Sequence, residues 1–239
     1  MQIRHRVLAW RVFPMSTSTQ PRGPRGLVAL SRAQSPGEEL ANSLSHGAGL
    51  VAALTGAPVL IVAAVQQRHV GMIVGASVFS AAMIVAYLCS TLYHALPEGR
   101  AKRVFRVLDH VSIFLLIAGT YTPFTLGVLE GAWGWSVFGM IWLLALAGTV
   151  MKFTGGLRKP WLSTGLYLLM GWLVLVAIHP LWLRMPVSGL VWLAAGGVAY
   201  TLGVPFFARD ERIRYAHAVW HLFVLTGTIC HFAAVFASV

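Results

Sequence analysis

Charged side chains are scarce in this sequence of 239 residues, where they make up only 10% of the total. A soluble domain carries about 25% charged residues. Hydrophobic residues make up 57% of the chain, and acidic residues number only 7. So few charges could not cover a core of that size in water. The composition therefore excludes an ordinary soluble globular protein and indicates a membrane protein.

Disulfide and nucleic-acid-binding patterns are also lacking. The two cysteines, Cys89 and Cys230, are too few for a disulfide framework. We expect no bond between them. The net charge of +11 lies in short basic tracts between apolar runs, without a basic face of interleaved aromatics. We therefore expect no nucleic-acid partner and interpret the charge as a topology signal.

Long apolar runs dominate the rest of the chain. Each run can be compared with the roughly 20 residues that a helix needs to cross a bilayer. The sequence predicts an all-α integral membrane protein, a bundle of seven transmembrane helices separated by short polar breaks. The predicted spans are 44–65, 70–96, 107–127, 135–151, 161–178, 187–207 and 216–238.

The basic residues predict the orientation of these spans. Sixteen of the 18 Lys and Arg residues lie in the N-terminal tail or at the second, fourth and sixth breaks. Only Arg68 and Arg184 lie in the other breaks. Because cytoplasmic loops are enriched in Lys and Arg, we expect a cytoplasmic N-terminus and a C-terminus outside. The expected location is the inner (plasma) membrane, as a multi-pass protein.

Residues 1–38 differ from the rest in composition. They are rich in Arg, Pro, Ser and Gly and contain no apolar run long enough for a signal-peptide core. They predict a disordered basic cytoplasmic tail, followed by a membrane domain at 39–239. Met15 is an alternative start, in which case the upstream stretch would be a gene-prediction extension.

Several histidines lie near the predicted cytoplasmic ends of the spans. His94 closes the second span and shares a helix face with Ser90, four residues earlier. His217 and His221 open the seventh span with the same spacing, which stacks two imidazoles on one face, as in helices that grip a metal. The topology places the end of the second span and the starts of the third and seventh at one depth. We therefore expect His94, Asp109, His217 and His221 to meet near the cytoplasmic surface.

This combination predicts a zinc site. Three neutral histidines with an open position for water form a catalytic type of zinc site. Asp109 would orient a histidine or hold the water, and Ser90 would donate a hydrogen bond to the water or to a substrate carbonyl. The alternative is that these histidines only reach the interface or form hydrogen bonds between helices. Asp109 would then be a helix N-terminal carboxylate stabilised by the dipole.

Other polar groups in the spans fit the metal site less well. His46 also lies at the cytoplasmic end of its span. It could be a fourth polar group of the site, but we favour packing or interfacial hydrogen bonding for it. His110 points about 100° away from Asp109 around the helix, and His231 lies about 15 Å beyond the seventh-span pair. Neither is expected to bind the metal. Pro123 predicts a freed carbonyl and a kink in the third span.

At these residues the chain resembles the hemolysin III family, the bacterial branch of the progestin and adipoQ receptor (PAQR) superfamily. The combination of SxxxH, an Asp in the third helix and a terminal HxxxH is specific, and it covers the chain from about residue 40 to 239. The matching stretches are Glu39 to Gly47, Ser90 to His94, Leu108 to Pro123 and His217 to His231. The resemblance implies a seven-helix bundle with a cytoplasmic N-terminus, and Zn2+ held by His94, His217 and His221.

The resemblance also implies a chemistry. The wider superfamily includes adiponectin receptors and alkaline ceramidases, which cleave the amide of ceramide. By analogy, the chain would be a zinc-dependent amidohydrolase acting on lipid amides, with Asp109 as the catalytic base and Ser90 steadying the oxyanion. Membrane lipids, such as a fatty acid or a ceramide-like ligand, would be its partners.

Two other functional classes remain open. One is a non-enzymatic sensor or regulator of membrane lipid homeostasis with a structural zinc. The other is a cytolysin (hemolysin), as the family name suggests. The cytolysin is the weakest of the three, because seven apolar helices without an amphipathic, lumen-lining pattern describe a resident membrane protein. The sequence predicts neither the lipid substrate nor the oligomeric state.

Overall fold

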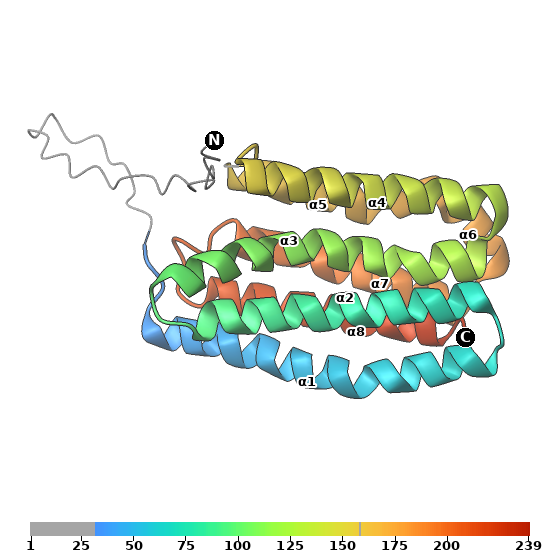
Figure 1. Ribbon diagram of the computed structural model, residues 1–239, viewed down its shortest axis with the longest axis horizontal. Helices are drawn as coiled ribbons and strands as arrows, with labels where there is room; N and C mark the ends of the chain where they lie inside the picture. The colour runs from blue at the N-terminus through green and yellow to red at the C-terminus, as the bar shows by residue number, and fades with distance from the viewer. Residues whose placement is uncertain (1–31, 158) are drawn as a thin grey trace, which may run out of the picture. The chain divides into compact units, whose positions relative to one another are not determined.

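Every regular element in the part of the chain that the structure describes is a helix (Figure 1). The computed structural model describes residues 32–157 and 159–239, and Arg32–Val239 form one compact unit. Most of the predicted tail, with the alternative start at Met15, lies outside the described residues. The two cysteines are free, which confirms the absence of a disulfide between them.

Seven helical segments of the described residues are long and apolar enough to cross a membrane, which confirms the predicted fold class. Two of these segments are composite. A π-helical turn, η1, extends α3, while a 3-10 turn, η2, and α6 extend α5. The elements are α1 Pro36–Gln66, α2 Val70–Ala95, α3 Arg100–Pro123, η1 Phe124–Leu129, α4 Gly131–Thr154, α5 Pro160–Trp172, η2 Leu173–Ala177, α6 Ile178–Arg184, α7 Val187–Phe207 and α8 Ala216–Phe236.

The first helix begins at Pro36, eight residues before the predicted start of the span. Ser35 caps it: its hydroxyl accepts the Glu38 N–H, and the Glu38 carboxylate accepts the Ser35 N–H. This reciprocal capping box, with proline in the first turn, fixes a helix start. Glu38 and Glu39 therefore lie in the first turn of α1, and the predicted boundary of the tail at residue 38 falls inside a helix.

Glu38 also ties the start of α1 to the start of α8. Its carboxylate forms a paired salt bridge with Arg32 and accepts the backbone N–H of Tyr215 at 2.9 Å. Tyr215 precedes α8 and has a left-handed backbone, with φ of 59°. This is an uncommon conformation for a non-glycine residue, and the Glu38 contact helps to hold it.

Two spans depart from a plain α-helix. The third span changes to π-helical geometry at Phe124, directly after Pro123, where the helix crosses α2 closely. A Cβ on Gly75 of α2 would lie 2.3 Å from the Pro123 Cα, so only glycine permits this approach. The fifth span continues through η2 and α6 to Arg184. The sequence-based end at 178 was therefore too early, and His179 is helical rather than part of a loop.

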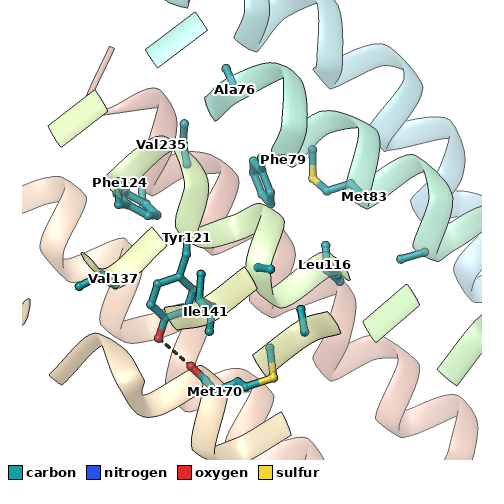
Figure 2. Close-up of a cluster of buried hydrophobic side chains, with 14 of the residues drawn as sticks. Ala76, Phe79, Met83, Leu116, Tyr121, Phe124, Val137, Ile141, Met170 and Val235 are labelled. Atoms are coloured by element: carbon teal, nitrogen blue, oxygen red, sulfur yellow. Dashed lines mark hydrogen bonds between the residues drawn. The ribbon is translucent and has the colours of Figure 1, made fainter. Parts of the chain in front are cut away.

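The bundle interior is packed with large apolar side chains from several spans (Figure 2). Phe79 of α2 is fully buried, and Leu116 and Tyr121 of α3 are buried close to Met170 of α5. The Tyr121 hydroxyl donates a hydrogen bond to the Met170 carbonyl at 2.8 Å, which satisfies a phenol in the membrane interior. This core fixes α3 and α5 relative to the helices around them.

Helix α2 packs against α1 and α3, while α8 packs against α1 and α7. Successive spans run in opposite directions, so the starts of α1, α3 and α8 and the end of α2 lie at the same end of the bundle (Figure 1). The candidate site forms at this end.

Candidate metal centre

Three histidines from two helices converge at this end of the bundle. His94 lies in the last turn of α2, and His217 and His221 lie in the first two turns of α8. Their candidate ligand atoms all lie within 4.8 Å of one another. His94 and His221 are 4% and 2% exposed, and His217 is half-buried. The predicted convergence of the three rings is confirmed, and the cluster is close enough to hold a metal ion.

Two of these imidazoles are each held by a carboxylate. The Nδ1 atom of His94 lies 2.6 Å from Oε2 of Glu39, in the first turn of α1. The Nδ1 atom of His217 lies 2.8 Å from Oδ2 of Asp210, in the loop between α7 and α8. An ionised carboxylate only accepts, so each Nδ1–H donates to it and each Nε2 carries the lone pair.

The third imidazole, that of His221, is oriented by uncharged groups of α1. The Nδ1 atom of His221 lies 3.1 Å from the backbone carbonyl of Asn42 and 3.0 Å from Oγ of Ser45. Because a carbonyl only accepts, the His221 Nδ1–H donates to it, and again Nε2 carries the lone pair. Metal-binding histidines usually donate their other N–H to such a partner.

The remaining nitrogens fit a metal ion. The Nε2 atom of His94 is buried and has no hydrogen-bond partner among the described residues. An unsatisfied buried acceptor is costly in a membrane interior, and a metal ion would satisfy it. The cluster contains no fourth His, Cys, Asp or Glu from the described ranges. Three neutral imidazoles with an open fourth position match a catalytic zinc site, although the geometry does not identify the ion.

Sequence reasoning missed the partners of the histidines. The predicted start of the first span at residue 44 leaves Glu39 and Asn42 outside the helix, whereas α1 begins at Pro36. Their spacing from His46, seven and four residues, was an available signal: it puts all three on one face of a longer helix. Asp210 gave no comparable signal, since it lies in a loop.

Asp109 and Ser90 border the same space as the histidines. Both residues line a cavity that also contacts His217 and His221. Asp109 is half-buried, and its carboxylate makes no hydrogen bond or ion pair within the described ranges. Ser90 is 2% exposed, and its Oγ lies 2.7 Å from Nδ1 of His46. Neither residue contacts a candidate ligand through a hydrogen bond, and their catalytic roles remain predictions.

The other membrane histidines stay outside the metal cluster. His46 packs face to face on His221, with ring centroids 3.5 Å apart and an angle of 8°, and its hydrogen bond goes to Ser90. His110 Nδ1 donates to the Arg106 carbonyl at 2.6 Å. His231 is not a member of the cluster. The cluster of candidate ligands among the described residues therefore consists of His94, His217 and His221.

A cavity of about 1350 Å³ is lined in part by two members of the histidine cluster, His217 and His221. At one end it is lined by Asp109, His217 and His221, and at the other end by Leu181 and Trp182 of α6. Between these ends its walls come from α2, α3, α5, α7 and α8 and are mostly apolar.

Comparison with known proteins gives one consistent result. A family model described as "Haemolysin-III related" matches residues 35–232. The chain is 40% identical over 198 residues to "Hemolysin-3" of Bacillus cereus, covering 83% of this chain and 90% of that protein. It is 38% identical over 198 residues to "Hemolysin-3 homolog" of Bacillus subtilis (strain 168), covering 83% and 92%. The human "Monocyte to macrophage differentiation factor" is 31% identical over 170 residues, covering 66% and 67%. No solved structure gives a significant match.

Proposed function

Because the chain belongs to the haemolysin-III family of multi-pass membrane proteins, we propose that it is a zinc-dependent hydrolase of lipid amides. One observation carries the proposal. The Nδ1 atoms of His94, His217 and His221 are each held by another protein group, and the three side chains lie close enough to hold one metal ion. Two of them, His217 and His221, also line a largely apolar cavity.

The donor set favours zinc over Mg2+ and Ca2+. Neutral imidazoles suit zinc, whereas Mg2+ and Ca2+ prefer oxygen ligands. A zinc ion held by His94, His217 and His221 would supply Lewis acidity and lower the pKa of a water molecule toward neutrality. The absence of a fourth ligand among the described candidates leaves room for that water, as a hydrolase requires.

Asp109 is suited to take a proton from the attacking water. Its carboxylate borders the cavity beside His217 and His221 and is not engaged by any other described side chain. A free, half-buried carboxylate can accept a proton and return it to the leaving amine. The Asp109 side chain lies on α3, apart from the ligand-bearing helices, and so it can act without disturbing the ligands.

Ser90 is suited to donate a hydrogen bond to the carbonyl oxygen of the substrate as negative charge develops there. This role requires the Ser90 proton to be free. It is free when His46 Nδ1–H donates to the Ser90 oxygen, across the 2.7 Å contact between these atoms. His46 would then hold Ser90 in place, as a positioning residue in the same cavity.

The apolar part of the cavity supports a lipid substrate. Its volume of about 1350 Å³ exceeds what a small metabolite needs, and its far end is lined by Leu181 and Trp182. The acyl chain would lie along this space with the amide at the histidine end. Hydrolysis would release a fatty acid and an amine.

Purified protein in lipid nanodiscs, supplied with zinc and a panel of N-acyl lipids, tests the proposal. We expect release of free fatty acid, and we expect no release from a His217→Ala/His221→Ala variant. Two results together would contradict the hydrolase: no release of fatty acid by the zinc-loaded wild-type protein, and no change in lipid composition when the gene is deleted. A lipid sensor with a structural zinc would then be the better description.

A further inference from the structure

We propose that Glu39, held by the buried Lys102, is the positioning residue that directs the Nε2 atom of His94 toward the metal. The inference rests on the proposed zinc site and assigns a role to two residues outside the ligand set. Glu39 Oε2 lies 2.6 Å from His94 Nδ1, and Glu39 Oε1 accepts a hydrogen bond from Lys102 Nζ at 2.9 Å. One carboxylate therefore connects α1, α2 and α3 directly at the metal centre.

Lys102 is placed where a lysine is rarely found. It is 7% exposed, and its ammonium group also donates to the Leu96 carbonyl at 3.2 Å and lies 5.1 Å from the centre of the Tyr93 ring. A buried ammonium is stable only when it is paired and hydrogen-bonded. Glu39 supplies the pairing charge, so Lys102 fixes which carboxylate oxygen remains for His94.

His94 needs a positioning residue more than the other ligands do. His217 and His221 stand four residues apart on α8, so the helix sets their separation. His94 is the single ligand from α2, and Ala95 is the last residue of that helix. Helix ends fray, and the ring could rotate without a partner. The Glu39 contact removes that freedom.

The contact also selects the tautomer of His94. The carboxylate oxygen can only accept, so Nδ1 carries the proton and Nε2 presents its lone pair. A second candidate partner at Nδ1, the Asn42 amide, is 3.4 Å away and also donates to Gln34. The shorter, charge-assisted contact with Glu39 therefore determines the state of the ring.

Glu39→Gln should disturb this arrangement in a specific way. The glutamine amide has one acceptor oxygen and one NH2 group, which only donates. Lys102 also only donates, so it takes the oxygen and leaves the NH2 group facing His94 Nδ1. That contact favours a proton on Nε2, and in this tautomer Nε2 cannot bind the metal. Removing the lysine releases the glutamine oxygen for His94.

The prediction is therefore a rescue. We expect Glu39→Gln to weaken zinc binding by about 10–100-fold, the usual range for a lost ligand-orienting partner. Lys102→Met alone should weaken it less, because Glu39 still accepts from His94. The double variant Glu39→Gln/Lys102→Met should bind zinc more tightly than Glu39→Gln. If the ion pair had only a structural role, the double variant should bind zinc no more tightly than Glu39→Gln, because removing both partners cannot restore packing.

The test is competition with a zinc chelator on purified full-length protein in detergent, with thermal unfolding of the metal-free forms as a check on folding. Glu98→Gln is the matched control, because Glu98 is exposed near the same end and contacts no histidine. A wild-type protein that binds no zinc contradicts the proposed function itself. If the wild-type protein binds zinc but Glu39→Gln binds it equally tightly, only the role of Glu39 and Lys102 is contradicted. The same holds if the double variant binds zinc no more tightly than Glu39→Gln.

Discussion

The imidazole rings of His46 and His221 stack almost parallel, with centroids 3.5 Å apart, although 175 positions separate them in the chain. His46 thereby contacts a candidate ligand with its face and Ser90 with its Nδ1 atom. It links the histidine cluster to Ser90, the residue that we propose stabilises the substrate oxyanion.

His46→Phe should separate these two contacts. The phenyl ring retains the stacking on His221, so we expect zinc to stay bound. The hydrogen bond to Ser90 is lost, so amide hydrolysis should fall by up to about 10²–10³-fold, as for a lost oxyanion donor. Ser90→Ala should give a similar loss. If the two residues act as one unit, the double variant will be no slower than either single variant in a fatty-acid release assay.

His217→Ala/His221→Ala should remove the zinc. One imidazole cannot replace the two lost bonds, and the remaining His94 lies on a different helix. Elemental analysis of the purified protein should give about one zinc per wild-type chain and none for the variant. His179→Ala, an exposed position on α6, is the control and should keep its zinc. A double variant with a full complement of zinc would show that the ion binds elsewhere.

Asp109→Asn should keep zinc and lose hydrolysis. Asparagine has a similar shape but cannot take up a proton, and Asp109 is not part of the histidine cluster. The loss should be about 10²–10⁴-fold and should appear in kcat, as expected for a general base. Complementation of a deletion strain gives a second measurement. Restoration of the normal lipid profile by Asp109→Asn would mean that no base is needed at this position.

Zinc affinity should fall in acid. The three ligands must be neutral to bind, so protons compete with the metal. An ordinary histidine has a pKa of about 6.5, and binding should weaken as the pH falls through the range in which imidazoles take up protons. Titration of zinc retention against pH checks this. Zinc retention that is independent of pH down to about 4 would point to ligands other than histidine.

The orientation in the membrane is tested by reporter fusions. The distribution of Lys and Arg predicts that the loop between α2 and α3 lies in the cytoplasm and that the end after Val239 lies outside. Fusions at Arg100 and after Val239 should therefore give opposite signals. A cytoplasmic reporter at the C-terminus would reverse the orientation and move the candidate metal centre to the outer face.

The sequence contains strong signals for the spans and for the ligands. Apolar runs with short polar breaks are sufficient to predict seven helices, and the HxxxH spacing of His217 and His221 is a local property of α8. The proximity of His94 to His217 and His221 follows from counting the spans. Because successive spans run in opposite directions, the end of the second span and the start of the seventh lie at the same depth. These predictions depend on periodicity and length, which are properties of the chain alone.

The surroundings of the ligands were harder to predict. The start of α1 depends on a capping box at Ser35, and a hydropathy criterion overlooks the polar first turns that carry Glu39 and Asn42. The contact of Asp210 with His217 depends on the path of a loop, which no periodic pattern encodes. The continuation of the fifth span through a 3-10 turn likewise depends on tertiary packing around η2.

The bond from Glu38 to the Tyr215 N–H has a consequence for biogenesis. It joins the first membrane helix to the start of the last one. The candidate ligands are likewise divided between an early helix, α2, and the last helix, α8. During synthesis, six spans leave the ribosome before His217 and His221 exist. If the histidine cluster holds zinc as proposed, the nascent chain can acquire the ion only after α8 has been synthesised. Metal loading would then mark a chain that contains all seven described spans, and products truncated before α8 would lack metal at this site.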